Sequence, residues 1–173
     1  MLRADLELIR EANAFHRAGT GKAKEVRELV RRDEVYWLER DSATQAQGLL
    51  WSELDSLKQA FNRGLFLGLI DFEGHYAAYP AGGFYKRHLD CFQRGNSRMV
   101  SIVLYLNQDW QPRDGGRLRV YGPSGRPSDE YVDIDPEGGT LVCFLSRESE
   151  HEVLPSHAAR MSFTGWFKTA PLL

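Results

Sequence analysis

From residue 65 onward the chain is a succession of short segments rich in β-branched and aromatic residues, with no helical pattern between them. Turn signals separate these segments at 80–83, 114–116, 122–125 and 136–139. Many short strands joined by turns bury their apolar faces by packing one sheet on another. The pattern therefore predicts a mainly β protein with a double-stranded β-helix, a jelly-roll of cupin-like shape. The expected strands lie at about 65–70, 75–79, 84–90, 99–106, 117–121, 130–134, 139–146 and 160–167.

The N-terminal part, residues 1–63, has a helical period instead. Apolar residues recur there at three- and four-residue steps, first at Leu2, Leu6 and Ile9 and again at Val26, Leu29 and Val30. A third helix is predicted between Ser52, which can cap its start, and Gly64, which stops it. Its apolar face holds Leu50, Leu54, Leu57 and Phe61. We expect these helices to buttress one face of the sheets.

The segment between the second and third expected helices divides into two parts. Residues 35–38 have the composition of a strand, and the polar run 40–48 is a candidate mobile loop. No repeat or linker interrupts the chain, and 173 residues fit one domain. We therefore expect a single α+β domain over 1–173, with a helical part at 1–63 and a β core at about 65–168.

Charge and cysteine content limit the expected partners and compartment. The chain has 22 Lys and Arg against 24 Asp and Glu, a formal net charge of −2, which favours neither nucleic acid nor an anionic membrane as a partner. Cys91 and Cys143 form no C-x-x-C motif, and no apolar run is long enough for a membrane helix or a signal peptide. We expect a cytoplasmic monomer.

His88 and Asp90 are two positions apart, which on a strand directs both side chains to the same side of the sheet. A third donor, His151, follows the predicted strand at 139–146. Two imidazoles and one carboxylate on one side of a metal are typical of Fe(II) enzymes that bind O2. The alternative is that His88 and Asp90 are a surface pair and His151 a hydrogen-bonded turn residue, because H-x-D motifs also occur by chance.

Arg160 favours the metal interpretation. It lies nine positions after His151, at the start of a strand that is otherwise apolar and aromatic, where a guanidinium is costly unless it meets a carboxylate. 2-Oxoglutarate would supply that carboxylate, and the planar fork of arginine matches it better than lysine. His75 and His157, by contrast, are interpreted as structural or surface histidines.

Several segments together resemble the 2-oxoglutarate oxygenases related to the hypoxia-inducible-factor prolyl hydroxylases, including their bacterial members. The resemblance runs from about Arg31 to Lys168. The segments that carry it are Tyr79-Pro80 with its Gly-rich turn, 85–90 (YKRHLD), 105–110 (YLNQDW), 115–119 (GGRLR) and the spacing from His151 to Arg160.

The resemblance implies a role for each of eleven residues. Iron would be bound by His88, Asp90 and His151, and the distal carboxylate of 2-oxoglutarate by Arg160 and Tyr105. Tyr79 would lie beside the iron-bound end, Leu118 would pack on the co-substrate, and Thr164 and Trp166 would line the cavity. Arg98 and Tyr85 would lie near the substrate, and the loop at 40–48 would close over it.

The implied activity is hydroxylation of a prolyl residue at C4, of the peptidyl-proline 4-dioxygenase type, with release of succinate and CO2. It would use Fe(II), 2-oxoglutarate and O2, with ascorbate as a further expected ligand. The bacterial members resembled are associated with elongation factor Tu, which makes that protein the leading substrate hypothesis. The alternatives are a hydroxylase of a ribosomal protein or a free amino acid, and a cupin-like binding module without turnover.

Overall fold

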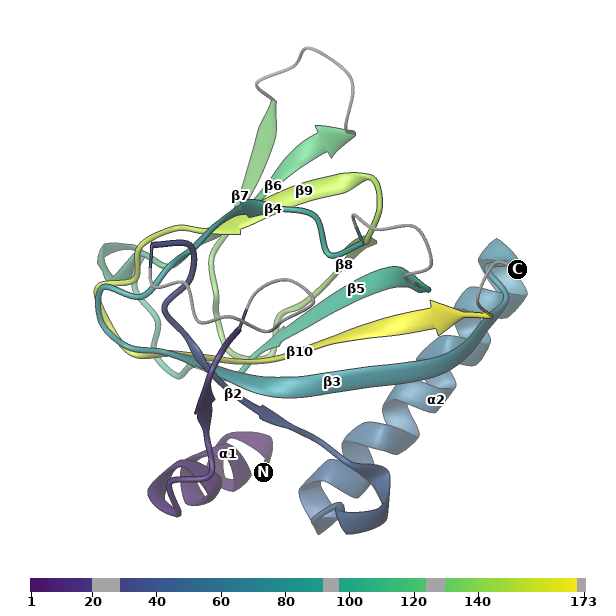
Figure 1. Ribbon diagram of the computed structural model, residues 1–173, viewed down its shortest axis with the longest axis horizontal. Helices are drawn as coiled ribbons and strands as arrows, with labels where there is room; N and C mark the ends of the chain where they lie inside the picture. The colour runs from purple at the N-terminus through teal and green to yellow at the C-terminus, as the bar shows by residue number, and fades with distance from the viewer. Residues whose placement is uncertain (20–28, 92–96, 124–129, 171–173) are drawn as a thin grey trace.

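Two antiparallel sheets face each other, and two helices lie under the larger one (Figure 1). The structure is a computed structural model that describes residues 1–19, 29–91, 97–123 and 130–170. The larger sheet has the order β1 (His16–Arg17), β2 (Glu34–Trp37), β3 (Leu69–Tyr79), β10 (Arg160–Thr169), β5 (Arg98–Tyr105) and β8 (Leu141–Leu145). The smaller sheet has the order β4 (Tyr85–His88), β9 (Ser149–Val153), β6 (Leu118–Pro123) and β7 (Tyr131–Ile134).

This arrangement confirms the predicted double-stranded β-helix, and most of the strand positions. The segments expected at 65–70 and 75–79 are one long strand, β3, because helix α2 extends to Leu65 and the strand then runs unbroken from Leu69. Two strands were not predicted. β1 is only two residues long, and β9 contains four polar or charged residues among its five, so neither has the apolar pattern of a buried strand.

The helices are α1 (Leu2–Glu11) and α2 (Gln45–Leu65), and the prediction for the start of α2 was wrong. Thr44 caps the helix instead of Ser52: its hydroxyl accepts from the Gln47 amide, and the Gln47 side chain accepts from the Thr44 amide. The cap is tied to α1, because the Thr44 hydroxyl also donates to Asp5 Oδ1 at 2.7 Å.

The prediction of a mobile loop at 40–48 was therefore wrong. Residues Arg40–Ser42 form a short 3-10 helix, and residues 45–48 are the first turn of α2. Sequence polarity misled the prediction, because an N-terminal helical turn with capping residues is as polar as a loop. The expected helix at 26–30 falls mostly outside the described residues, and Leu29 and Val30, which are described, lie in a turn.

Two apolar cores lie on the two sides of the larger sheet. The first joins the sheet to both helices and includes Leu6, Trp51, Phe72, Tyr76 and Phe167. This confirms the buttressing role expected for the helices. The second core lies between the two sheets, and its members include Val35, Tyr79, Tyr105, Leu118 and Val153. Alternation along each strand separates the two sets, because successive side chains point to opposite faces.

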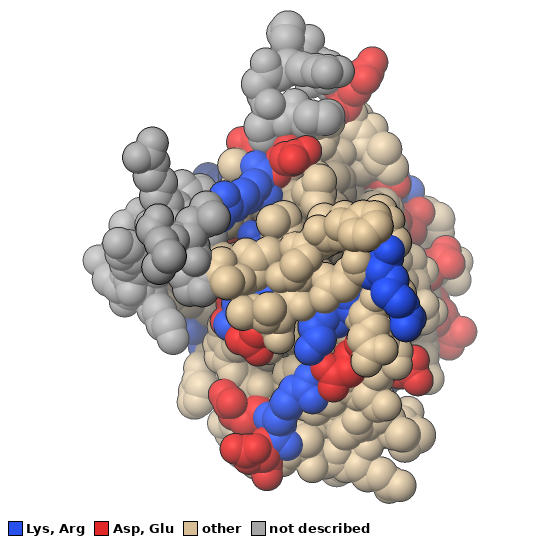
Figure 2. Space-filling view, turned by 90° about the vertical axis from the view of Figure 1, so that its right-hand side faces the viewer, with Lys and Arg blue, Asp and Glu red and all other residues tan. Residues whose placement is uncertain are grey.

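The surface carries both signs of charge. Figure 2 shows Lys and Arg next to Asp and Glu among uncharged residues. The ion pair of Lys168 with Asp71 at 2.8 Å joins the neighbouring strands β10 and β3, and that of Arg98 with Glu73 at 2.8 Å joins β5 to β3 across β10. Neither described helix combines the length and the apolar character needed to cross a membrane.

Candidate metal centre

His88 and His151 come together because strands β4 and β9 are neighbours in the smaller sheet. The two residues are direct Cα partners across the antiparallel pair, and their ring centroids are 4.2 Å apart. Each ring packs on an aromatic neighbour: Tyr85 stacks on His88 at 3.6 Å, and Phe144 lies 4.6 Å from His151. His151 thus lies within a strand and opposite His88, not in the connection after β8.

Backbone carbonyls fix the tautomer of both imidazoles. His88 Nδ1 lies 2.8 Å from the Lys86 carbonyl oxygen, and His151 Nδ1 lies 3.2 Å from that of Ser149. A carbonyl only accepts, so each Nδ1 carries the proton and each Nε2 keeps its lone pair. Burial lowers the pKa of His151 to about 4, against the opposing attraction of Asp90. Both rings are therefore prepared to bind a metal through Nε2.

Asp90 completes the group. Its Oδ1 is 3.6 Å from His88 Nε2 and its Oδ2 is 3.6 Å from His151 Nε2, and the three donor atoms all lie within 4.8 Å of one another. Burial by itself would raise the pKa of Asp90, but His151 and His88 outweigh it and hold the pKa well below its usual range. Two imidazole nitrogens and one carboxylate oxygen are a donor set that suits Fe(II).

One detail of the sequence argument was wrong. Strand β4 ends at His88, and Asp90 lies in a bend beyond it, so strand alternation does not direct its carboxylate. Ser101 on β5 donates a hydrogen bond of 2.7 Å to Asp90 Oδ2 across the space between the sheets. Ser101 was not identified from the sequence, because a lone serine in a strand carries no recognisable signal.

A buried arginine lies in the same layer between the sheets. Arg160, the first residue of β10, is 1% exposed, and its Nε donates to the Gly116 carbonyl at 2.9 Å. Its guanidinium carbon is 5.0 Å from the ring centroids of both Tyr79 and Tyr105. Within the described part of the chain no carboxylate forms an ion pair with Arg160, so its charge is not compensated by the protein there.

The hydroxyl of Tyr105 is a second unsatisfied group beside this arginine. It is buried and has no hydrogen-bond partner among the described residues. Burial raises the pKa of Tyr105, so the hydroxyl is a proton donor at neutral pH. A buried cation without an ion-pair partner and a buried hydroxyl without a hydrogen-bond partner there fit the carboxylate of an organic acid, which would satisfy both.

The turn 114–116 helps to position the Arg160 side chain. Gly116 has a φ of 63°, and a Cβ there would lie 2.9 Å from Ser156 Oγ and 3.1 Å from Arg160 Cδ. Only glycine combines this backbone conformation with such close packing. The Gly-Gly pair that the sequence marked as a turn thus brings a carbonyl within hydrogen-bonding distance of the arginine.

The other residues predicted to bind the co-substrate lie on the inner faces of the strands. Arg160, Thr164 and Trp166 are at even positions of β10, on the face opposite Phe163 and Phe167, which pack in the helix-side core. Leu118 on β6 and Tyr79 at the end of β3 belong to the core between the sheets. All the residues predicted for the metal and the acid therefore point into one layer.

The two residues predicted to contact a substrate lie close to the ligands. Tyr85 stacks on His88, and the Arg98 guanidinium lies 3.6 Å from the ring centroid of Trp166. An ion pair that the sequence did not reveal packs against Tyr85. Arg31 forms a 2.5 Å ion pair with buried Asp33, and its guanidinium lies 4.3 Å from the centroid of the Tyr85 ring. Sequence proximity alone cannot distinguish such a pair from two solvated surface charges.

Two further histidines, His75 and His157, have the positions expected of structural or surface residues. His75 is buried between Trp37 and Trp166, and its Nδ1 contacts the Tyr76 carbonyl at 3.1 Å. His157 is exposed, and its Nδ1 contacts the Arg113 carbonyl at 2.8 Å. Neither belongs to the group formed by His88, Asp90 and His151.

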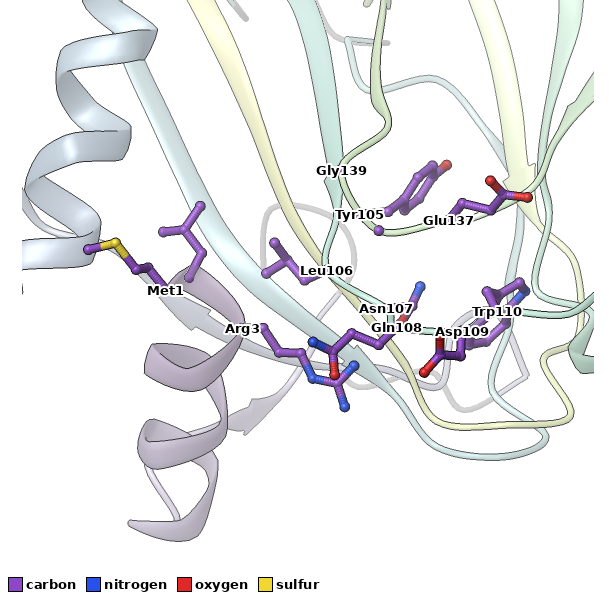
Figure 3. A pocket seen from close by; sticks show the side chains of 12 residues that line it. Met1, Arg3, Tyr105, Leu106, Asn107, Gln108, Asp109, Trp110, Glu137 and Gly139 are labelled. Atoms are coloured by element: carbon purple, nitrogen blue, oxygen red, sulfur yellow. The ribbon is translucent and has the colours of Figure 1, made fainter.

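A separate open pocket lies at the end of β5, beside the start of α1 (Figure 3). Arg3, Gln108, Asp109, Trp110 and Glu137 are among the residues that line it. None of the three candidate ligands lines this pocket, so it is not part of the metal centre.

Comparison with known proteins agrees with this geometry. The sequence pattern of the 2OG-Fe(II) oxygenase superfamily matches residues 74–168. Human Egl nine homolog 1 is 35% identical over 146 residues, covering 80% of this chain, and the Caenorhabditis elegans hypoxia-inducible factor prolyl hydroxylase is 32% identical over 151 residues. The chain spans 33% of the length of the human relative and 20% of that of the nematode relative.

Two solved structures are similar over nearly the whole chain. A Pseudomonas putida prolyl-4-hydroxylase superposes with a TM-score of 0.85 at 43% identity, covering 97% of this chain and 84% of that one. A Trichoplax adhaerens prolyl hydroxylase in complex with a hypoxia-inducible factor peptide fragment also has a TM-score of 0.85, at 31% identity, with coverage of 96% and 76%.

Proposed function

Because the chain belongs to the 2OG-Fe(II) oxygenase superfamily, we propose that it hydroxylates a prolyl residue at C4 in a protein substrate. The observation that carries this proposal is the convergence of two features in one layer: the group of His88, Asp90 and His151, and the buried, uncompensated Arg160. The group of three ligands suits Fe(II), and Arg160 suits the far carboxylate of 2-oxoglutarate.

In this proposal the three ligands would hold the iron, and its remaining positions would be available to the co-substrate and O2. The bound metal, 2-oxoglutarate and O2 supply the oxidation, in which 2-oxoglutarate becomes succinate and CO2 and one oxygen atom enters the substrate C–H bond. The chain's own contribution is to hold both imidazoles with Nε2 toward the metal, through the Lys86 and Ser149 carbonyls.

Arg160 and Tyr105 would bind the distal carboxylate, the arginine by charge and the tyrosine by its hydroxyl proton. Leu118, which is 1% exposed, would form an apolar wall beside the acid, with Tyr79 next to its metal-bound end. Thr164 and Trp166 would line the remaining space. Such a dry pocket strengthens each of these electrostatic contacts, because little water competes for them.

A protein substrate is favoured over a small molecule by the residues beside the ligands. Trp37, with 41% of its surface exposed, lies 6.1 Å from Trp166, and Tyr85 and Arg98 are only partly buried. A partly open aromatic and cationic surface suits a peptide segment that presents a proline, whereas a free amino acid would be better served by a closed pocket. The Trichoplax relative, which was solved with a peptide, supports the same choice.

The leading candidate for the substrate is elongation factor Tu, on the resemblance to bacterial members of the family. The test is to reconstitute the full chain with Fe(II) and 2-oxoglutarate without oxygen, and then to admit air in the presence of elongation factor Tu or ribosomal proteins. Mass spectrometry should find one added oxygen on a single prolyl peptide, together with succinate.

The outcomes of this test separate the alternatives. Succinate formation that depends on another protein, with no change in elongation factor Tu, would keep the chemistry and reject that substrate. Failure to consume 2-oxoglutarate with any protein or amino acid substrate would favour a binding module without turnover. The His151→Ala variant is the control for oxidation by free iron.

A further inference from the structure

Asp90 is the one candidate ligand that lies outside a strand. His88 and His151 are held by the β4 and β9 ladder, whereas Asp90 follows β4 in a bend. Its carboxylate is nevertheless 9% exposed and lies within 3.6 Å of both imidazoles. Contacts from the opposite sheet must therefore contribute to fixing its position.

Two buried serines, Ser101 on β5 and Ser146 directly after β8, provide such contacts. Ser101 Oγ donates to Asp90 Oδ2 at 2.7 Å, and Ser146 Oγ lies 2.8 Å from Ser101 Oγ. Ser101 is 1% exposed and Ser146 is 0% exposed. The order of the protons follows from the donors available. A metal-binding carboxylate is ionised and only accepts, so the single Ser101 proton points to Asp90, and Ser146 donates to Ser101.

Backbone contacts place Ser146 firmly in this chain of hydrogen bonds. Its amide donates to the Met99 carbonyl at 3.0 Å, and its carbonyl accepts from the amide of Cys91 at 3.2 Å. Ser146 thus contacts both the strand that carries Ser101 and the residue that follows Asp90. The three segments, β5, the end of β8 and the bend after β4, are joined at one point.

We propose that Ser101 and Ser146 are positioning residues for Asp90: Ser146 orients the Ser101 hydroxyl, and Ser101 fixes the rotation of the ligand carboxylate. The proposal rests on the metal site of the proposed function. Neither serine contacts the metal in this arrangement. Both act through Asp90, by reducing the conformations that its carboxylate can adopt before metal binds.

This role predicts a specific effect on metal affinity. Removing an outer partner of a metal ligand typically lowers metal affinity by about 10- to 100-fold. Ser101→Ala should fall in that range. Ser146→Ala should have a smaller effect, because Ser101 keeps its bond to Asp90 and loses only the group that orients it. Ser101→Thr retains a hydroxyl at the same position and should bind metal nearly as well as the unaltered chain.

The two serines should also be coupled. If Ser146 acts only through Ser101, then the double variant Ser101→Ala, Ser146→Ala should bind metal as Ser101→Ala does, with no additional loss. Two serines that merely filled space would give independent effects, which add. This coupling is the result that a general packing role would not produce.

The experiment is a calorimetric titration of Mn2+ into the metal-free full chain, with Mn2+ as an air-stable substitute for Fe(II). Ser162→Ala is the matched control, because Ser162 is equally buried on the neighbouring strand but no described residue hydrogen-bonds to its hydroxyl. Thermal unfolding of each metal-free variant measures stability separately, so a loss of affinity in a folded variant can be assigned to the site.

Support requires a loss of at least about tenfold in Ser101→Ala, no loss in Ser162→Ala and non-additivity in the double variant. Affinity within about twofold of the unaltered chain in Ser101→Ala, or additive losses, would overturn the proposal. If the metal site itself is wrongly assigned, other measurements will show it. The unaltered chain would then not bind Mn2+, or His151→Ala would bind Mn2+ with the same affinity as the unaltered chain.

Discussion

His88 on β4 and His151 on β9 face each other as direct partners in the smaller sheet, although 63 positions separate them in the sequence. Each Nδ1 is occupied by a carbonyl two residues earlier in its own strand, Lys86 for one and Ser149 for the other. Strand pairing and local hydrogen bonding therefore orient both imidazoles in the same way. The smaller sheet thus orients two of the three candidate ligands before any metal is bound.

The first prediction concerns this pair. His151→Ala should lower succinate formation by more than about 100-fold, since removing a ligand costs more than removing its outer partners. The far-UV circular dichroism spectrum should be unchanged, because the strand remains. The matched control is His157→Ala, in which an exposed histidine with a similar carbonyl contact is removed. Undiminished turnover in His151→Ala would remove His151 from the site.

Arg160→Lys tests whether the planar guanidinium of Arg160 is needed to bind the far carboxylate of 2-oxoglutarate. The substitution keeps the positive charge but removes the planar fork, so it should raise the KM for 2-oxoglutarate by about tenfold or more. Arg160→Ala should have a larger effect, because a buried carboxylate then lacks its cation. The measurement is the dependence of succinate formation on 2-oxoglutarate concentration. Equal KM values in Arg160→Lys and the unaltered chain would contradict bidentate binding.

Tyr105→Phe separates co-substrate binding from stability. Its hydroxyl has no hydrogen-bond partner in the described part of the chain, so removing it should not lower the free energy of unfolding. It should still weaken 2-oxoglutarate binding by about tenfold, since a hydrogen bond to a charged group contributes about 1.5 kcal/mol.

Tyr76→Phe is the reciprocal control for this prediction. The Tyr76 hydroxyl donates to Asp5 Oδ2 at 2.7 Å, so that variant should lose about 1.5 kcal/mol of stability and keep its affinity for 2-oxoglutarate. Urea unfolding and calorimetry measure the two quantities. The opposite pattern, a destabilised Tyr105→Phe with normal 2-oxoglutarate binding, would assign that hydroxyl a structural role.

The stability of the metal-free chain should fall as the pH is lowered from about 6.5 to about 4. Burial lowers the pKa of His75 to about 4, with Arg31 acting in the same direction and Asp33 against it, and burial also lowers the pKa of His151 to about 4. Both side chains are neutral in the folded chain and protonated in the unfolded chain within this window. Above this window the two titrations favour neither state, and as the pH falls through it, proton uptake by the unfolded chain progressively destabilises the fold.

The His75→Gln variant isolates one of these two contributions. Each histidine can change the free energy of unfolding by at most about 1.4 kcal/mol per pH unit. The slope of stability against pH, from urea unfolding of metal-free protein, should be shallower in the variant than in the unaltered chain. Equal slopes would show that His75 does not titrate as its burial implies.

The β core could be predicted from the sequence, and the residues proposed for the site could be selected from it, because their signals are local. Turn residues at 80–83 and 136–139 separate apolar segments, and His88, Asp90 and Arg160 are residue types that are costly without partners. What the sequence could not provide was the pairing of β9 with β4. The strand Ser149–Val153 is polar, and its position opposite His88 depends on contacts made by distant segments.

The errors in the N-terminal part have a similar cause. The run at 40–48 was predicted as a loop from its polarity, but Thr44 and Gln47 form a capping box that begins α2. The same polar residues are compatible with a loop or with the first turn of a helix. Their contact with Asp5 of α1 cannot be read from the sequence. Ser101 was overlooked because its importance lies in a contact with Asp90 across the two sheets.

The assignment of the site can be tested by a crystal structure of the full chain grown with Mn2+ and 2-oxoglutarate. We expect one Mn2+ bound by Nε2 of His88, the Asp90 carboxylate and Nε2 of His151, with the far carboxylate of 2-oxoglutarate against Arg160 and Tyr105. A metal bound elsewhere, or a diacid that does not contact Arg160, would contradict it.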